Sequence, residues 1–360
     1  MIVRKECVIC CNDLKLIFAR EKYPITASPP TNSEEFDIYT DQTFYKCVNC
    51  SCIQLGNLVD PILLYDSAHN NTMNTPTWKE HHTLFAKFIG NDNDILEIGG
   101  CGHLYNILKS INEQKIEYSC LDICDPIEKI DDVIYLKGNC ETFNFPQKTL
   151  VLSHTFEHLY NPRNFLSSIQ RSNIRSIYIS IPDMMKSIDL GVPNFLHNEH
   201  TYYIDKYLIE WLFSEYGYVC QKYYEFKNHS LFFYFQKGDV NKQTKLENRR
   251  FIAEKIHSDF KNESSRLHNL VIKEKSFIMP AGLFGQFLCY TCPTKNILGF
   301  IDNDISKQNK RVYGTTFFVY SLEDALRLTP EYIYLIAGPY TNEIKDQIRL
   351  YDQRVEIIVL

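Results

Sequence analysis

Short apolar runs recur through the middle of the chain. They lie at 94–98, 118–122, 133–136, 150–153 and 177–181. Runs of this length bounded by turn signals are typical of buried strands, and the segment that follows the first run has apolar residues at helical spacing. Strands that alternate with helices predict an α/β fold with a largely parallel, Rossmann-like sheet.

A glycine-rich bend follows the first run, where Glu97 precedes Gly99, Gly100 and Gly102. Glycine has no Cβ, so it takes positive φ and lets a ligand lie against the backbone at the open end of a parallel sheet. The spacing departs from Gly-x-Gly-x-x-Gly, which argues against a nicotinamide or flavin site. Glu97 before the glycines resembles the pattern of S-adenosylmethionine (SAM) methyltransferases. The resemblance implies SAM as the cofactor, with this acid near its methionine end.

Two later turns supply further candidates for binding SAM. Asp122 ends the second strand, about twenty residues after the bend, where a carboxylate can bind a ribose diol. In a SAM domain the turn after the third strand passes the adenine, so Asn139 and Glu141 are expected to hydrogen-bond the edge of that base.

His154, Glu157 and His158 follow the fourth strand, at the carboxyl edge of the sheet where ligands bind. Their order is the inverted zincin pattern, His-x-x-Glu-His, which some proteases use to hold a metal. Because the pattern follows a strand of a cofactor domain, we favour a SAM and substrate site there over a catalytic metal.

The loop before the predicted helix 204–216 is the richest polar segment of the chain. It contains His197, Glu199 and His200. Imidazole has an ordinary pKa of about 6.5 and can take up a proton near neutrality, and a neighbouring carboxylate can orient it. His229, before the predicted strand 231–235, is a candidate for the same cavity.

Thirteen cysteines in a chain without an apparent export signal indicate thiols and metal rather than disulfides. Four of them form two Cys-x-x-Cys pairs, Cys7 with Cys10 and Cys47 with Cys50. Two such pairs can close a tetrahedron of thiolates around Zn²⁺. The sequence therefore predicts a structural zinc in a loop-rich module that could not bury a core alone.

The order of these features predicts three folded parts and two connections. The predicted parts are a zinc-binding module at 1–60, a linker or lid helix at 61–89, a SAM methyltransferase domain at 90–238, a helical connector at 239–275 and a C-terminal Rossmann-like domain at 276–360. The last domain repeats the strand–glycine–helix pattern, and we expect it to hold no cofactor of its own.

Composition excludes several classes of partner. The net charge of −6 leaves no basic excess for nucleic acid. No apolar stretch approaches about twenty residues, the length of a membrane span, and the N-terminus lacks the apolar region of a signal peptide. We therefore expect a cytoplasmic protein that binds neither nucleic acid nor membrane, with a monomer favoured.

Taken together, the cysteine module, the bend at 97–102, the segments 153–158 and 198–202 and the Rossmann-like tail resemble the nucleotide-sugar C-methyltransferases. The resemblance covers nearly the whole chain. It implies methylation of carbon in a dTDP-linked keto-deoxysugar, with a histidine that removes the proton next to the keto group. His200 matches that base, with Glu199 beside it, and His197 stands where the family usually has tyrosine.

The residues expected to face the substrate come from several of these segments. They are Tyr65, Asn70, His158, Tyr202 and His229, while His154 is expected to serve both SAM and catalysis. Two other functions stay open: SAM-dependent methylation of oxygen or nitrogen on a glycan or small molecule, and a non-catalytic, zinc-stabilised binding protein.

Overall fold

The computed structural model of the chain describes residues 2–26, 30–65, 76–126, 128–189, 196–238, 254–255, 258, 261–262, 265–336 and 341–360. The chain divides into two compact units. The first contains 1–19, 43–190 and 200–256, and the second contains 20–42, 191–199 and 257–360. In the part of the chain that is described, no helix is long and apolar enough to cross a membrane.

A seven-stranded sheet forms the centre of the first unit, in the order β13-β14-β11-β10-β7-β8-β9. Its strands are β7 (Asp94–Ile98), β8 (Glu117–Asp122), β9 (Val133–Lys137), β10 (Thr149–Ser153), β11 (Ser176–Pro182), β13 (Tyr218–Phe226) and β14 (Ser230–Lys237). The first five pair in parallel, and β14 pairs antiparallel with both β11 and β13.

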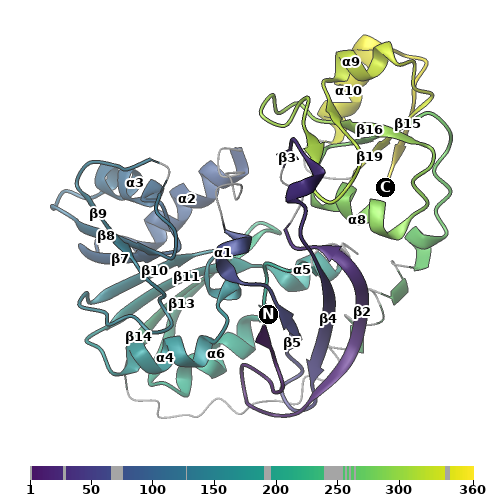
Figure 1. The fold of residues 1–360 in the computed structure, drawn as a ribbon. Helices are drawn as coiled ribbons and strands as arrows, with labels where there is room; N and C mark the ends of the chain where they lie inside the picture. The colour runs from purple at the N-terminus through teal and green to yellow at the C-terminus, as the bar shows by residue number, and fades with distance from the viewer. Residues whose placement is uncertain are drawn as a thin grey trace. The chain divides into compact units, whose positions relative to one another are not determined.

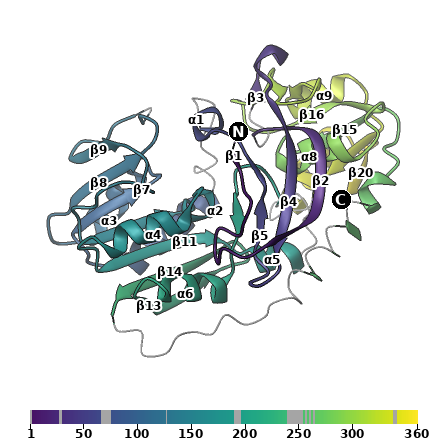
Figure 2. The same ribbon diagram turned by 60° about the horizontal axis from the view of Figure 1, so that its bottom comes forward.

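Helices cover both faces of this sheet (Figures 1 and 2). On one face, α4 (Pro162–Gln170) and α6 (Lys206–Ser214) bury Phe165 and Leu212 against strand residues such as Leu152. On the other face, α2 (Pro76–Ile89) and α3 (His103–Ile111) bury Phe85 and Leu108. The sheet is therefore the middle of three layers, as expected for strands that are apolar on both sides.

The strand order fixes where a ligand can bind. From β7 the chain adds β8 and then β9 on one side, and afterwards crosses to β10 and β11 on the other. The order therefore reverses between β7 and β10. In open α/β sheets, ligands bind outside the carboxyl ends of the strands at this switch point. The glycine bend follows β7 and the histidine segment follows β10, so both lie at that position.

The cysteine module contains more regular structure than the sequence suggested. Four strands form a sheet in the order β12-β5-β4-β2. They are β2 (Leu14–Pro24), β4 (Tyr39–Cys47), β5 (Ile53–Leu55) and β12 (Tyr202–Tyr203), while β1 (Ile2–Val3) pairs with β6 (Asn57–Leu58). The prediction of a loop-rich module is therefore wrong for 14–24 and 39–47, which form β2 and β4.

The second unit contains a five-stranded parallel sheet in the order β18-β16-β15-β19-β20. Its strands are β15 (Ser276–Met279), β16 (Ile297–Ile301), β18 (Val319–Tyr320), β19 (Tyr332–Leu335) and β20 (Glu356–Val359), and its helices are α8 (Leu283–Thr291), α9 (Leu322–Arg327) and α10 (Thr341–Tyr351). Two short strands, β3 (Pro30–Thr31) and β17 (Arg311–Val312), pair beside it. The Rossmann-like pattern predicted for the tail matches this strand order.

The acidic residue after β16 is already neutralised. In dinucleotide-binding sheets a carboxylate at this position binds the ribose. Here Asp302 Oδ2 lies 2.9 Å from Lys307 Nζ, and Asp302 Oδ1 accepts a hydrogen bond from the Asp304 N–H at 2.9 Å. The absence of a cofactor in this unit stays a prediction.

The α/β class is confirmed, and the predicted strands of the central sheet match the observed ones to within a residue or two. The strand β13 and the short helix α5 (Met184–Asp189) were not predicted. The helix predicted at 61–89 is observed as α1 (Pro61–Leu64) and α2, and 66–75 lie outside the described residues. The division into five parts stays a prediction, because most of the connector at 239–275 lies outside the described residues.

Candidate active site and metal centre

The glycine bend wraps around its own carboxylate. Gly99 and Gly102 have φ of +70° and +89°, a region that L side chains rarely adopt. The Glu97 side chain is buried, and its Oε2 accepts a hydrogen bond from the Gly102 N–H at 3.2 Å. A Cβ at Gly100 would lie 2.1 Å from the Glu97 carboxyl carbon. Gly100 must therefore be a glycine for the bend to pack. Burial raises the pKa of Glu97.

Thr155 joins the glycine bend to the histidine segment. Its Oγ1 donates a hydrogen bond to the Ile98 carbonyl at 2.9 Å. A Cβ at Gly99 would lie 2.5 Å from the Thr155 methyl group. The two segments are thus in van der Waals contact at the switch point, and a ligand held by one would lie beside the other.

The residues predicted to bind SAM lie on the loops of this edge. Asp122 Oδ1 accepts from the Cys124 N–H and Asn139 Oδ1 from the Glu141 N–H, both at 2.9 Å. Glu141 Oε1 accepts from the backbone N–H groups of residues 160 and 161 at 2.5 and 2.7 Å, so this carboxylate supports the start of α4. Contacts of Asp122, Asn139 and Glu141 with SAM stay predictions.

The bend has the features that a SAM molecule requires. Gly102 precedes α3 and provides no side-chain cap, so backbone N–H groups at the start of this helix are left for a ligand. Asp122 ends the neighbouring strand β8, at the position of a ribose-binding acid. The residues present therefore fit the cofactor.

Glu157 lies at the centre of a group of three histidines. Its Oε1 is 3.5 Å from His154 Nδ1, 3.8 Å from His158 Nε2 and 3.9 Å from His200 Nε2. The Glu157 side chain is only 4% exposed, and within the described residues neither carboxyl oxygen has a hydrogen-bond partner. Burial raises the pKa of Glu157 to about 8. A buried carboxyl without partners is costly, which marks this group as functional.

His154 connects this group to a second cluster of imidazoles. Its φ of +52° is rare for a residue other than glycine. His154 Nε2 lies 2.8 Å from Ser230 Oγ, which in turn lies 2.5 Å from His229 Nδ1. The Trp78 ring packs on both imidazoles, with centroids 4.8 and 4.9 Å away. Burial lowers the pKa of both histidines, so they are neutral near pH 7.

The predicted substrate residues have different surroundings. The Tyr65 hydroxyl lies 2.7 Å from His158 Nδ1 and so orients this ring toward Glu157. Tyr202 is fully buried, and its hydroxyl donates to the Phe156 carbonyl. The Tyr202 side chain thus packs against the histidine segment, and its contact with substrate stays a prediction. Asn70 lies outside the described residues.

His197 and Glu199 belong to the second unit, whereas His200 belongs to the first. His197 Nδ1 accepts from the Glu199 N–H at 3.3 Å, and Glu199 Oε1 accepts from the Thr26 hydroxyl at 3.3 Å. Both side chains are buried. Their catalytic roles stay predictions.

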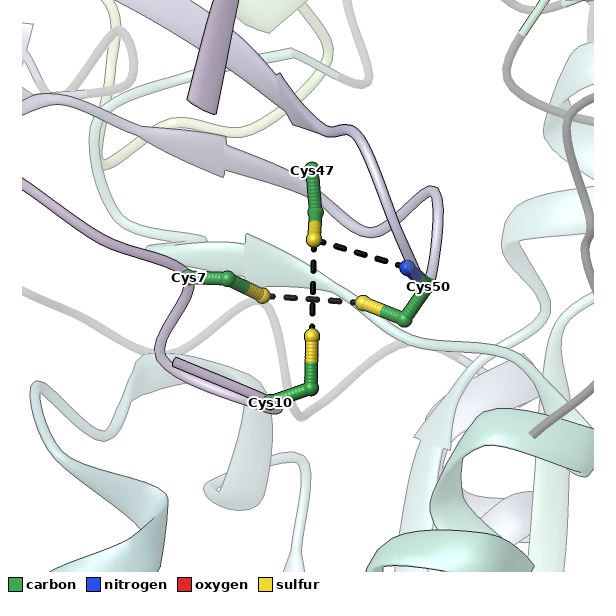
Figure 3. A group of neighbouring side chains, drawn as sticks. All are labelled: Cys7, Cys10, Cys47 and Cys50. Atoms are coloured by element: carbon green, nitrogen blue, oxygen red, sulfur yellow. Dashed lines mark hydrogen bonds between the residues drawn. The ribbon is translucent and has the colours of Figure 1, made fainter. Parts of the chain in front are cut away.

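The four predicted zinc ligands converge. The sulfur atoms of Cys7, Cys10, Cys47 and Cys50 all lie within 4.8 Å of one another (Figure 3). The Cys7–Cys50 and Cys10–Cys47 sulfur pairs are 3.5 and 3.4 Å apart. Four thiolates 2.3 Å from a tetrahedral Zn²⁺ would be roughly 3.8 Å apart. The residues therefore fit zinc, and Cys52 is not part of the group.

The cysteine module holds the loop that carries His200. The Leu55 N–H on β5 donates to the Thr201 carbonyl at 3.0 Å, next to His200. The buried Arg4 guanidinium also donates to the Thr201 carbonyl, and at 2.8 Å to the Tyr160 carbonyl. Burial lowers the pKa of Arg4 to about 10. The position of His200 thus depends on residues that precede the central sheet in sequence.

Sequence analysis did not identify three residues of this site. Glu157 entered only as part of the His-x-x-Glu-His pattern, and Ser230 and Arg4 were not considered. The Glu157–His158 dipeptide after a strand was a usable signal. A serine that starts a strand and an arginine near the N-terminus carry no local signal, because their importance comes from partners that are distant in sequence.

No protein-family model and no curated protein sequence matches the chain. Among solved structures, the chain is similar to a SAM-dependent methyltransferase from Aquifex aeolicus (17% identity, TM-score 0.37, 46% of this chain and 95% of that chain). It is also similar to the 1,6-didemethyltoxoflavin-N1-methyltransferase of Burkholderia thailandensis (9% identity, TM-score 0.40, 53% of this chain and 98% of that chain). A third similar structure is the magnesium protoporphyrin IX methyltransferase of Synechocystis PCC 6803 (11% identity, TM-score 0.37, 48% of this chain and 91% of that chain). Such remote likenesses carry no argument about function.

Proposed function

We propose that this protein is a SAM-dependent C-methyltransferase that acts on a nucleotide-linked keto-deoxysugar, with His200 as the base. One observation carries the proposal. The glycine bend after β7 and the segment after β10 are packed together through Thr155 at the switch point of the sheet, and Glu157 of that segment lies near His154, His158 and His200.

SAM would supply an electrophilic methyl group when bound at the glycine bend. A carbon acceptor becomes a nucleophile only after it loses a proton, and a neighbouring keto group makes that C–H acidic. A neutral imidazole at the site can take this proton. His200 is suited to do so because its side chain is 20% exposed, whereas Glu157 behind it is buried. The keto-sugar and its nucleotide are carried over from the sequence resemblance.

Methyl transfer from labelled SAM to a panel of dTDP-linked and other nucleotide-linked keto-sugars tests the proposal. Product with the methyl group on carbon supports it, and transfer only to oxygen or nitrogen refutes it. The substitution His200→Gln should lower turnover by about 10²-fold or more while SAM affinity stays within about two-fold, because a base acts on the chemical step. Failure of wild-type protein to bind SAM in calorimetry would indicate a binding protein without this chemistry.

A further inference from the structure

Glu157 has no assigned role in the proposed reaction, although it is the most deeply buried member of the histidine group. Both of its oxygens lack hydrogen-bond partners within the described residues, and three imidazole nitrogens surround one of them. The group facing it therefore consists of His154, His158 and His200. The Tyr202 hydroxyl below is already bonded to a backbone carbonyl.

A line of proton-carrying groups leads from Glu157 toward the surface. Glu157 Oε1 lies 3.5 Å from His154 Nδ1, and the opposite nitrogen of that ring lies 2.8 Å from Ser230 Oγ. Ser230 Oγ lies 2.5 Å from His229 Nδ1. A neutral imidazole accepts a proton on one nitrogen and releases one from the other, and a hydroxyl both accepts and donates. Each member can thus pass a proton onward without holding a charge.

The inner end of this line is placed to receive a proton, and the outer end is placed to release one to solvent. At the inner end, Glu157 Oε1 lies 3.9 Å from Nε2 of the proposed base, His200. This distance exceeds a hydrogen bond, but catalytic hydrogen bonds often tighten only when substrate is bound. At the outer end, the half-buried His229 follows the exposed Lys227 and Asn228. Ser230 lies between His154 and His229 and is fully buried, so a proton on its hydroxyl reaches solvent only through these neighbours.

We infer that Glu157, His154, Ser230 and His229 form a relay that carries the substrate proton from His200 to solvent. This inference rests on the proposed function. The substrate C–H bond breaks, its electron pair moves onto the keto oxygen as an enolate, and the proton forms an N–H bond on His200. It then moves to Glu157 as a proton leaves Glu157 for His154, and the transfer continues through Ser230 and His229 until one proton enters solvent. His200 returns to its neutral form.

A matched pair of serine variants isolates the relay. Ser230→Ala removes the hydroxyl between His154 and His229. Ser180→Ala is the control, because Ser180 is equally buried and its hydroxyl lies 2.8 Å from His81 Nε2, outside the line. Glu157→Gln tests the inner end, since an amide cannot take up and release a proton at neutral pH.

The first measurement uses the protein alone. The rate at which the His154 imidazole N–H exchanges with solvent is measured by NMR on ¹⁵N-histidine-labelled protein. This rate should fall by about ten-fold or more in Ser230→Ala and stay unchanged in Ser180→Ala. An unchanged rate in Ser230→Ala overturns the relay. This outcome does not depend on any substrate.

The second measurement separates the relay from the proposed function. The keto-sugar that wild-type protein methylates is incubated in D₂O without SAM, and uptake of deuterium next to the keto group is recorded. The relay predicts that the ratio of deuterium uptake to single-turnover methyl transfer falls by about ten-fold in Ser230→Ala and Glu157→Gln, but not in Ser180→Ala. Absence of uptake in wild type refutes the proposed function. Uptake that is normal in both relay variants overturns the relay.

Discussion

The substitution Glu157→Gln should make the stability of the first unit less sensitive to pH. Burial raises the pKa of Glu157 from 4.5 in the unfolded chain to about 8 in the folded one. A group with a raised folded pKa contributes stability that is fully present below its unfolded pKa and is lost as the pH rises through its folded pKa. At about 1.4 kcal/mol per unit of pKa, the loss across this window amounts to roughly 5 kcal/mol at most.

The free energy of unfolding is measured by guanidinium denaturation at about pH 5 and about pH 9. These two pH values enclose most of the interval between the unfolded and folded pKa of Glu157. The chain has two tryptophans, Trp78 and Trp211, and both lie in the first unit, so their fluorescence reports on it. Because glutamine is neutral at every pH, its own cost of burial cancels when the two pH values are compared. The wild-type free energy of unfolding should therefore fall by several kcal/mol relative to Glu157→Gln as the pH rises.

Glu157→Asp is the matched control, because it keeps a carboxyl group at the site and should keep the pH dependence. If wild type and Glu157→Gln show parallel unfolding free energies at both pH values, the carboxyl is ionised in the folded protein. The argument that burial holds it neutral would then be refuted.

Three further substitutions test the other parts of the site. Cys47→Ser should abolish zinc binding, measured as metal per chain, and so remove on the order of 10 kcal/mol of binding free energy, whereas the exposed Cys11→Ser should retain the metal. Gly100→Ala should weaken SAM binding in calorimetry by about ten-fold or more, because its Cβ would meet a buried carboxyl at 2.1 Å; Gly138→Ala, whose Cβ would have only ordinary contacts at 3.5 Å, should not. Tyr65→Phe should cost about 1 kcal/mol, seen as a several-fold lower kcat at unchanged KM, and an equal change in KM alone would contradict the positioning role.

The central sheet was predictable because its strands are buried on both faces. Parallel strands covered by helices appear as short continuous apolar runs, and the runs at 94–98 and 150–153 match β7 and β10 closely. The glycine bend was predictable for a related reason: Gly99 and Gly102 occupy positive φ, where other residues are strained. These signals are local, so one sequence is enough to detect them.

The strands β2 and β4 of the cysteine module were missed because polar residues interrupt their apolar positions. The strand β2 includes Lys15, Arg20 and Lys22, and it is the edge strand of its sheet, with β4 as its neighbour. Its polar positions resemble a loop until that neighbour is known. The same limit applies to the catalytic group. The Glu157–His158 dipeptide is visible in the sequence, but its approach to His200 depends on a contact across 43 residues.

The contacts of the cysteine module would give a bound zinc a role in the proposed reaction as well as in folding. The second Cys-x-x-Cys pair ends at Cys50, and β5 begins at Ile53, only a short turn later. The β5 residues Ile53 and Gln54 pair with β12, whose first residue follows Thr201. A metal bound to this pair of cysteines would therefore hold β5 in position, and β5 in turn holds the backbone beside His200.

The glycine bend has no such dependence, because β7 and β8 hold it and both belong to the central sheet. Partial loss of zinc should thus impair proton removal from the substrate before it impairs SAM binding. In this arrangement the two halves of the proposed reaction rely on different supports. The methyl donor would be positioned by a rigid parallel sheet, and the base by a small sheet whose stability depends on a metal.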